Sequence, residues 1–382
     1  MWDDKHRLEG LLGVHVDDGI WGGHSPRFNR AQEHLRSLLN IKVEKSGTFE
    51  ILGRKLTQTK DMVVLDQHEY VRNVKPIPVS SERKKLRDVL LTPGERTQYL
   101  SLTQQLSWPA RTTMPGLCYL VSELQQKTSS ATVADLTRCN WVLRQAQEMS
   151  RNSCELRFLR DPAWKLEDLL LVVAHDASFG NQSNHGSQQG YVCLLGGSAK
   201  PLSEHAPGHF HMVDWGSSKI HRVVRSTLAA EAASASHAHD RGTLIRYALA
   251  WLVLGPSLRE QGRPPHWTDI IRAVRYALCT DCRSLSEHCS KCSSGLTEKR
   301  VGLDIADLRA SVDAGDSLLW QPTDKMVADG LTKHLPKEEN LMKVALENSY
   351  QVAYSKADSK KQKQKPRAPI PVLPIPAICV LR

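Results

Sequence analysis

The feature that most constrains the fold of this 382-residue chain is a pair of apolar runs, each followed by an aspartate. Leu169–Ala174 leads through His175 to Asp176, and Val274–Thr280 leads to Asp281. Short apolar runs of this kind are typical of buried strands, and a carboxylate at the end of such a strand is held rigidly at the sheet edge. The two runs therefore predict an α/β domain with acidic side chains at one edge of its sheet.

Two further acids stand in segments with helical character. Glu231 lies among small residues after Ser226 or Thr227, where a helix over 227–254 is expected to begin, and small residues let a helix pack closely on a sheet. Asp329 lies in an expected short helix over 324–334. Taken singly, each acid would be interpreted as an ordinary solvated carboxylate, one of 41 acidic residues in the chain. Together, four converging carboxylates would repel each other unless cations neutralise them, which predicts a Mg²⁺ site that hydrolyses phosphodiesters.

The segments around the four acids resemble the ribonuclease H domain of copia-like retrotransposon Pol polyproteins. The matching segments are Asp176–Ser178, Ser226–Ala232, Thr280–Leu285 and Ala328–Lys333. The resemblance spans nearly all of residues 10–345. It implies a mixed five-stranded sheet with flanking helices, and cleavage of the RNA strand of RNA–DNA hybrids with two Mg²⁺ or Mn²⁺ ions. It also implies that Asp176 bridges the two ions, that Glu231 and Asp281 hold one of them, and that Asp329 holds the other.

An acidic turn near the N-terminus carries a second resemblance. Residues 8–23 predict strand, tight turn and strand, with Asp17 and Asp18 in the turn. In this setting they resemble the Tyr/Phe-x-Asp-Asp hairpin of reverse transcriptases, although His15 stands where that family has Tyr or Phe, and a bare Asp-Asp pair is common in turns. The upstream strand with the third metal-binding Asp is missing from the sequence, so we expect no polymerase activity from this chain alone.

These resemblances divide the chain into four expected parts. They are a truncated palm and thumb remnant of α+β structure (1–80), a helical thumb or connection (81–165), an RNase H-like domain (166–345) and a basic, Pro-rich, disordered tail (346–382). The expected strands are 48–57, 62–65, 169–175, 191–195, 217–224 and 274–280. The expected helices are 26–39, 66–75 with Asp66 as N-cap, 95–127 with breaks near Pro109 and Pro115, 133–150, 227–254, 297–311 and 324–334. An inserted loop is expected at 255–269.

Charge indicates the class of partner. The net charge of +10 favours a polyanion, although residues 356–367 alone hold five Lys and one Arg. Lys219, Arg222 and Arg225 precede the Glu231 helix, and we predict that they contact phosphates of an RNA–DNA hybrid, with a solvated basic loop as the alternative. The chain shows no signal peptide and no apolar run long enough to span a bilayer, so we expect an intracellular protein, cytoplasmic or nuclear, without a membrane partner. The rest of a Pol polyprotein is a further expected partner.

Four cysteines have the spacing of a zinc site but an unfavourable setting. They are Cys279, Cys282, Cys289 and Cys292. Paired CxxC motifs usually indicate zinc. Here Asp281 lies inside the first pair, Cys279 belongs to a predicted packed strand, and the six-residue spacer is short, so we do not expect zinc.

Two alternatives to an enzyme remain open at this point. A relic could keep the fold and bind nucleic acid without turnover, as the missing polymerase half suggests. A zinc-dependent binding module is the other alternative, and it rests on the cysteines alone.

Overall fold

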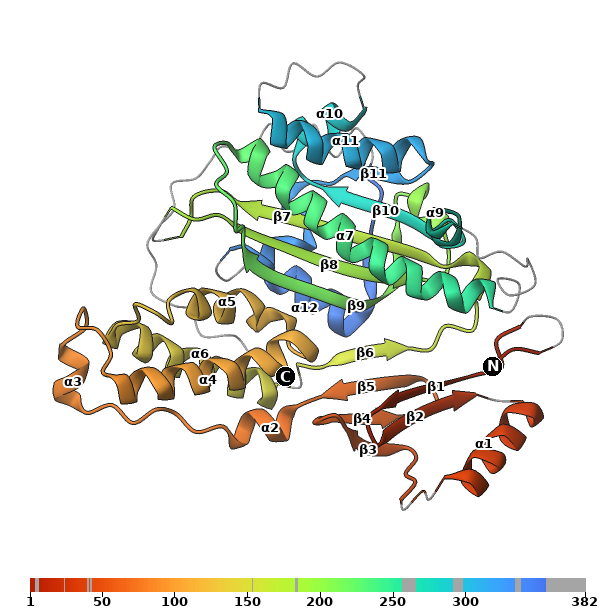
Figure 1. Ribbon diagram of the computed structural model, residues 1–382, viewed down its shortest axis with the longest axis horizontal. Coiled ribbons are helices and arrows are strands. Elements are labelled where there is room, and N and C mark those ends of the chain that lie inside the picture. Colours follow the sequence, from red (N-terminus) through yellow and green to blue (C-terminus); the bar gives the residue numbers. More distant parts are fainter. Residues whose placement is uncertain are drawn as a thin grey trace.

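The structure of the protein is a computed structural model that describes residues 1–354, except 4–6, 24, 40, 42, 153, 183–184, 256–265, 291–297 and 334–337. Figure 1 shows a large sheet with helices on both faces, a group of helices beside it, and an N-terminal part with smaller sheets. The predicted α/β class is confirmed. Within the described ranges, no helix is both long and apolar enough to cross a membrane.

The large sheet has six strands in the order β11-β10-β7-β8-β9-β12. In chain order they are β7 (Leu170–Ser178), β8 (Gln188–Gly196), β9 (Pro207–Lys219), β10 (Arg275–Thr280), β11 (Ser317–Trp320) and β12 (Ser349–Gln351). β7 pairs antiparallel with β8 and parallel with β10, and β10 pairs parallel with β11. β12 comes from a segment that we assigned to the tail, and it adds a sixth strand to the five expected.

Helices cover both faces of this sheet, which explains why β7 is apolar along most of its length. One face carries α7 (Thr227–Leu254), α9 (Trp267–Ile271), α10 (Arg283–Ser290) and α11 (Lys299–Asp313), and the other carries α12 (Glu338–Glu347) and the 3₁₀ helix η5 (Val327–Leu331). Leu171 and Val173 of β7 pack with the alanines of α7, whereas Leu170 and Val172 pack with α12 and η5. A strand buried on both faces reads as a continuous apolar run.

The alanine-rich helix α7 packs closely on the sheet. Of the two expected starting residues, Ser226 is the N-cap, and it accepts a hydrogen bond from the backbone N–H of Ala229. A Cβ added at Gly242 would lie 2.8 Å from side-chain atoms of both Val173 and Tyr276. Small residues therefore set the distance between helix and sheet, and this distance brings Glu231 to the strand ends.

The helical part forms its own core beside the sheet. Its elements are α2 (His68–Asn73), α3 (Ser81–Lys85), α4 (Pro93–Thr112), the 3₁₀ helix η1 (Pro115–Leu117), α5 (Cys118–Gln126) and α6 (Val133–Arg151). The predicted break near Pro109 is wrong, because α4 continues through it. Proline removes the N–H that would bond to the carbonyl four residues earlier. That carbonyl, on Gln105, accepts a hydrogen bond from the Tyr70 hydroxyl at 3.2 Å instead.

The N-terminal part contains two smaller sheets. The first is a hairpin of β1 (Gly10–His15) and β2 (Asp18–Gly23), followed by α1 (Pro26–Leu38). The second has the order β3-β4-β5-β6, with β3 (Thr48–Ile51), β4 (Arg54–Gln58), β5 (Met62–Asp66) and β6 (Leu156–Leu159). The single strand expected at 48–57 is a hairpin, turning at Leu52-Gly53, where both residues have positive φ. β6 follows the helical part in sequence yet pairs with β5, and the domain boundaries given above stay predictions.

Two further element predictions are wrong. The strand expected at 217–224 ends at Lys219 with β9, because Ile220 and Val224 pack against Ala177 and the alanines of α7. Apolar, β-branched residues are typical of strands, but here they belong to a loop that packs against the sheet and α7. The N-cap of α2 is Gln67, although the Asp66 carboxylate still accepts a hydrogen bond from the N–H of His68.

The remaining 3₁₀ helices are short connections between larger elements. They are η2 (Leu166–Asp168), η3 (Lys200–Leu202) and η4 (Thr323–Lys325). η4 leads directly into η5, which replaces the α-helix expected over 324–334. Asp329 thus lies in a tight 3₁₀ turn, and this turn presses against the end of the sheet.

Candidate metal centre

Three of the four predicted acids meet at the end of the large sheet. Asp176, Glu231 and Asp281 each present a carboxylate oxygen, and these oxygens lie within 4.8 Å of one another. They come from β7, from α7 and from the residue that follows β10. Three segments that lie about 50 residues apart in sequence thus supply one compact group of carboxylate oxygens.

Strand register explains why Asp176 and Asp281 are neighbours. Cys279 of β10 lies opposite Ala174 of β7 in a parallel pair, so two residues further along each strand Asp281 reaches the level of Asp176. The indole N–H of Trp320 donates to the carbonyl of Asp281 at 3.0 Å and fixes the chain where it leaves β10. The carboxyl ends of these two parallel strands therefore determine two of the three ligands.

Two hydrogen bonds place Glu231 over the end of β7. The hydroxyl of Ser234, one turn later on α7, donates to the carbonyl of Asp176 at 2.7 Å. The Glu231 carboxylate accepts a hydrogen bond from the backbone N–H of Ala177. Its Oε2 atom is buried and has no hydrogen-bond partner among the described residues. The third carboxylate is thus held in place with one oxygen that no described residue hydrogen-bonds, the Nδ1 atom of His175 lying 3.8 Å away.

The fourth acid, Asp329, is close to Asp176 but is separated from it by a lysine. The Lys333 ammonium forms an ion pair with Asp329, and it lies 3.2 Å and 3.3 Å from the two carboxylate oxygens of Asp176. The Thr332 hydroxyl also donates to Asp176. Asp329 is therefore part of the same site without belonging to the group of three close oxygens.

A glycine on β8 makes room for this segment. Gly190 lies directly opposite Asp176 in the β7–β8 pair. A Cβ added there would lie 2.6 Å from Cβ of Leu331 and 3.0 Å from Cγ2 of Thr332. The absence of a side chain at Gly190 lets η5 press against the sheet, so that Thr332 and Lys333 reach Asp176.

Burial makes these carboxylates reluctant to ionise. Burial raises the pKa of Asp176 to about 7; the carboxylates of Asp329 and Asp281 add to the rise, while Lys333 and Thr332 oppose it. Burial, with repulsion from Asp176 and Asp281, also holds the pKa of Glu231 well above its ordinary value. The pKa of Asp281 is raised mainly by burial.

The site stabilises the charged form of Lys333, whereas it disfavours the charged form of the carboxylates. Burial works against its charged form, yet the carboxylates of Asp176 and Asp329 outweigh burial and raise the pKa of Lys333.

The donor set fits a hard divalent cation. Three mutually repelling carboxylates, with one buried oxygen unpartnered among the described residues, are stabilised when a cation lies between them. Oxygen-only ligand sets suit Mg²⁺ and Mn²⁺ rather than softer metals. Asp176, Glu231 and Asp281 are the residues that would hold such an ion.

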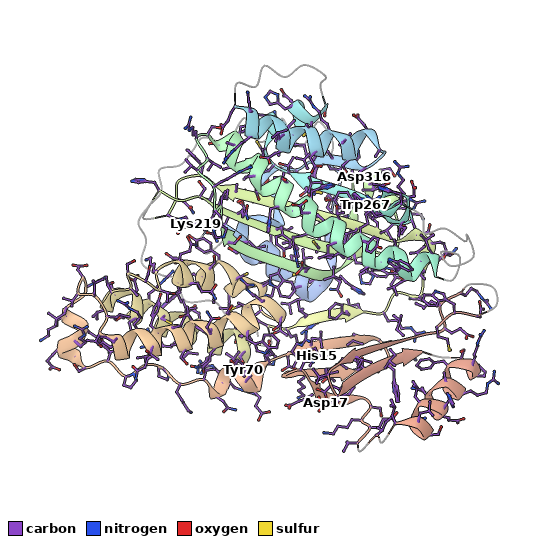
Figure 2. The ribbon with its side chains drawn as sticks, viewed as in Figure 1. His15, Asp17, Tyr70, Lys219, Trp267 and Asp316 are labelled. Carbon is purple, nitrogen blue, oxygen red and sulfur yellow. The ribbon has the colours of Figure 1, made fainter. Side chains whose placement is uncertain are left out.

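The three predicted phosphate contacts have different surroundings. Lys219 ends β9 at the same end of the sheet, and in Figure 2 its side chain lies at that rim. Arg225 is exposed in the loop before α7. Arg222 is engaged within the chain, since its guanidinium pairs with Asp304 of α11. Lys219 and Arg225 therefore remain the better candidates for a phosphate contact.

The acidic hairpin is far from this centre. Asp17 and Asp18 are exposed, and the predicted strand–turn–strand is confirmed, with His15 paired opposite Asp18. Figure 2 shows His15 and Asp17 in the lower part of the molecule, well away from Lys219. Among the described residues, no group of metal-binding side chains includes either acid.

The cysteine pattern is divided by the sheet. Cys279 packs on the face of the sheet that carries α12. Cys289 packs with α7 and α11 on the opposite face, and the partly buried Cys282 lies on that same face. Cys292 lies outside the described residues. Cys279 therefore points away from the other described cysteines of the motif.

Sequence reasoning missed four residues that shape the centre. They are Gly190, Ser234, Thr332 and Lys333. Thr332 and Lys333 belong to the segment that resembles the fourth family motif, so a signal was present for them. A lysine four residues after an aspartate can return to it on one helical turn. No comparable signal existed for Gly190 or Ser234.

Three solved structures are similar to parts of the chain. RNase H1 from the halophilic archaeon Halobacterium salinarum is 14% identical, over 45% of this chain and 97% of its own, with a TM-score of 0.24. The N-terminal RNase H domain of a Mycobacterium tuberculosis protein, fused to maltose-binding protein, is 15% identical, over 43% of this chain and 91% of its own, with a TM-score of 0.24. The protease-reverse transcriptase of prototype foamy virus is 11% identical, over 89% of this chain and 59% of its own, with a TM-score of 0.23.

No protein-family model matches the sequence, and a comparison with curated proteins gives no significant match. The structural neighbours are RNase H domains and a retroviral protease-reverse transcriptase, at low identity and low TM-score. The geometry of the centre therefore carries the functional proposal.

Proposed function

We propose that the chain is a fragment of a copia-like retrotransposon Pol polyprotein that hydrolyses the RNA strand of RNA–DNA hybrids with a divalent metal. The observation that carries this proposal is the convergence of Asp176, Glu231 and Asp281, whose carboxylate oxygens lie within 4.8 Å of one another at the end of a mixed sheet. Buried carboxylates that repel each other at a strand end suit a site for charged phosphate chemistry. The choice of an RNA–DNA hybrid as substrate follows from the resemblance of the sequence to copia-like RNase H domains.

The chain's own residues have distinct roles in this reaction. Asp176, Glu231 and Asp281 would hold the metal, and Thr332 would fix the rotamer of Asp176 through its hydroxyl. A bound divalent ion supplies the positive charge that activates water and stabilises the charge building on the phosphate. Ser234 keeps α7 against β7, so that Glu231 stays beside the strand ends during turnover. Lys219 and Arg225 are proposed to contact the backbone of the hybrid at the rim.

The test is cleavage of a labelled RNA–DNA hybrid by the purified full chain in Mg²⁺. We expect the wild type to cut the RNA strand and leave the DNA strand intact, and Asp176→Asn to show no detectable cutting. The variant keeps the size of the side chain and its bond to Thr332, so folding is preserved and can be verified by circular dichroism. A wild type that binds the hybrid without cutting it would favour a catalytically inactive relic and overturn the proposal.

A further inference from the structure

The centre has two unequal halves. On one side, the oxygens of Asp176, Glu231 and Asp281 form a close group, and no described lysine or arginine forms an ion pair with Glu231 or Asp281. On the other side, the ammonium of Lys333 already lies between Asp176 and Asp329. Asp176 is the carboxylate common to both halves. The position between Asp176 and Asp329 is where the family resemblance implies a second metal ion.

Lys333 is held firmly in this position from both ends. Its backbone N–H donates to the carbonyl of Asp329 at 3.1 Å, which closes the turn after η5. Its neighbour Thr332 donates to Asp176, and Gly190 provides the space that brings this segment against the sheet. These contacts fix the backbone from which the Lys333 side chain extends, and Asp176 and Asp329 hold the ammonium at its other end.

The net charge of the centre favours binding of one divalent ion, and not two, when the Lys333 ammonium is present. The four carboxylates, when ionised, carry four negative charges and Lys333 carries one positive charge. One divalent ion in the group of three leaves the centre slightly negative, whereas a second ion would make it positive. That second ion would also lie next to the ammonium, at a cost of several kcal/mol for like charges about 4 Å apart at a protein surface.

We propose that Lys333 acts as a built-in second cation, so that the centre binds a single divalent ion through Asp176, Glu231 and Asp281. This inference rests on the proposed function and makes it more specific. The Lys333 side chain is 33% exposed, so it also faces outward. An ammonium has three N–H donors, and contacts with Asp176 and Asp329 leave one for a phosphate oxygen of the substrate.

The test counts Mn²⁺ ions bound to the full chain, by electron paramagnetic resonance and by calorimetry, without substrate. We expect one ion for the wild type and two for Lys333→Met, with the second binding at least about tenfold more tightly than to the wild type. Adding Asp329→Asn to Lys333→Met should return the count to one, because the second position then loses a ligand. Lys333→Arg keeps the positive charge and should bind one ion.

The matched control is Lys325→Met. Lys325 is an exposed lysine of the nearby η4 whose closest acidic partner among the described residues is Asp324, at 3.8 Å, and its removal should leave the count at one. Thermal unfolding verifies that each variant is folded. Two ions of similar affinity in the wild type, or one ion in a folded Lys333→Met, would overturn the role of Lys333 and leave the proposed nuclease intact. No bound ion in either protein, together with no cleavage, would overturn both.

Discussion

The hairpin that carries Asp17 and Asp18 and the centre around Asp176 are both acidic, but their surroundings differ. The hairpin is a two-stranded sheet whose apolar residues face solvent, with Val14 69% and Val16 86% exposed. Asp176 is 1% exposed and contacts side chains from α7 and from the segment after η5. Several elements that bury carboxylates together raise their pKa values, as they do for Asp176.

The largest expected difference between the two regions is in catalysis. Asp281→Asn should lower the rate of RNA cleavage in an RNA–DNA hybrid by on the order of 10³-fold, because it removes one of three converging ligands. The double variant Asp17→Asn/Asp18→Asn changes two acids yet should cut at the wild-type rate. Single-turnover rates at saturating enzyme measure both. Loss of cleavage in the hairpin double variant would show that the two regions act together.

The second difference concerns stability against pH in the metal-free chain. The folded chain keeps a proton on Asp176 up to about pH 7, whereas the unfolded chain loses it near the ordinary value of 3.8. The unfolded state therefore binds fewer protons between these values, and the free energy of unfolding falls as pH rises from about 4 to 7. This contribution is on the order of 4 kcal/mol and stays lost above pH 7.

Urea unfolding in EDTA between pH 4 and pH 8 measures this effect. Asp176→Asn should reduce the decline, while Glu231 and Asp281, whose pKa values are also raised, account for the remainder. Mg²⁺ should restore stability to the wild type at pH 8. Asp17→Asn serves as the control, because it changes an exposed acid and should leave the pH profile unaltered. A wild-type profile equal to that of Asp176→Asn would show that burial of this carboxylate has no energetic consequence.

The same contrast explains how much of the molecule the sequence could predict. Apolar runs that end in Asp176 and Asp281 predicted two strands and two acids of the centre, because a strand buried on both faces has few polar positions. The 3₁₀ turn around Asp329 was missed, since short turns lack a periodic pattern. Gly190 and Lys333 matter only through contacts with distant segments, and a single sequence does not reveal which segments those are.

The third prediction concerns two glycines in strands. Gly190→Val should destabilise the chain by about 1–3 kcal/mol, because the new side chain overlaps Leu331 and Thr332. It should also weaken Mn²⁺ binding by displacing the segment that holds Asp176. A Cβ added at Gly22 of β2 would have no atom within 4 Å. Gly22→Val should therefore change the free energy of unfolding of the chain by less than about 0.5 kcal/mol. Equal effects of the two substitutions in urea unfolding would mean that η5 does not depend on Gly190.

The smallest expected effect is on binding of the hybrid at the rim. Lys219→Glu/Arg225→Glu should weaken binding of the catalytically silent Asp176→Asn chain by about tenfold and reduce its salt dependence, because two phosphate contacts are lost. The control is Arg30→Glu/Lys45→Glu, which reverses the same charge at exposed positions of the N-terminal part. Fluorescence anisotropy between about 50 and 200 mM salt separates a local contact from the overall charge. Equal losses in the two double variants would assign the effect to net charge and remove Lys219 and Arg225 from the substrate path.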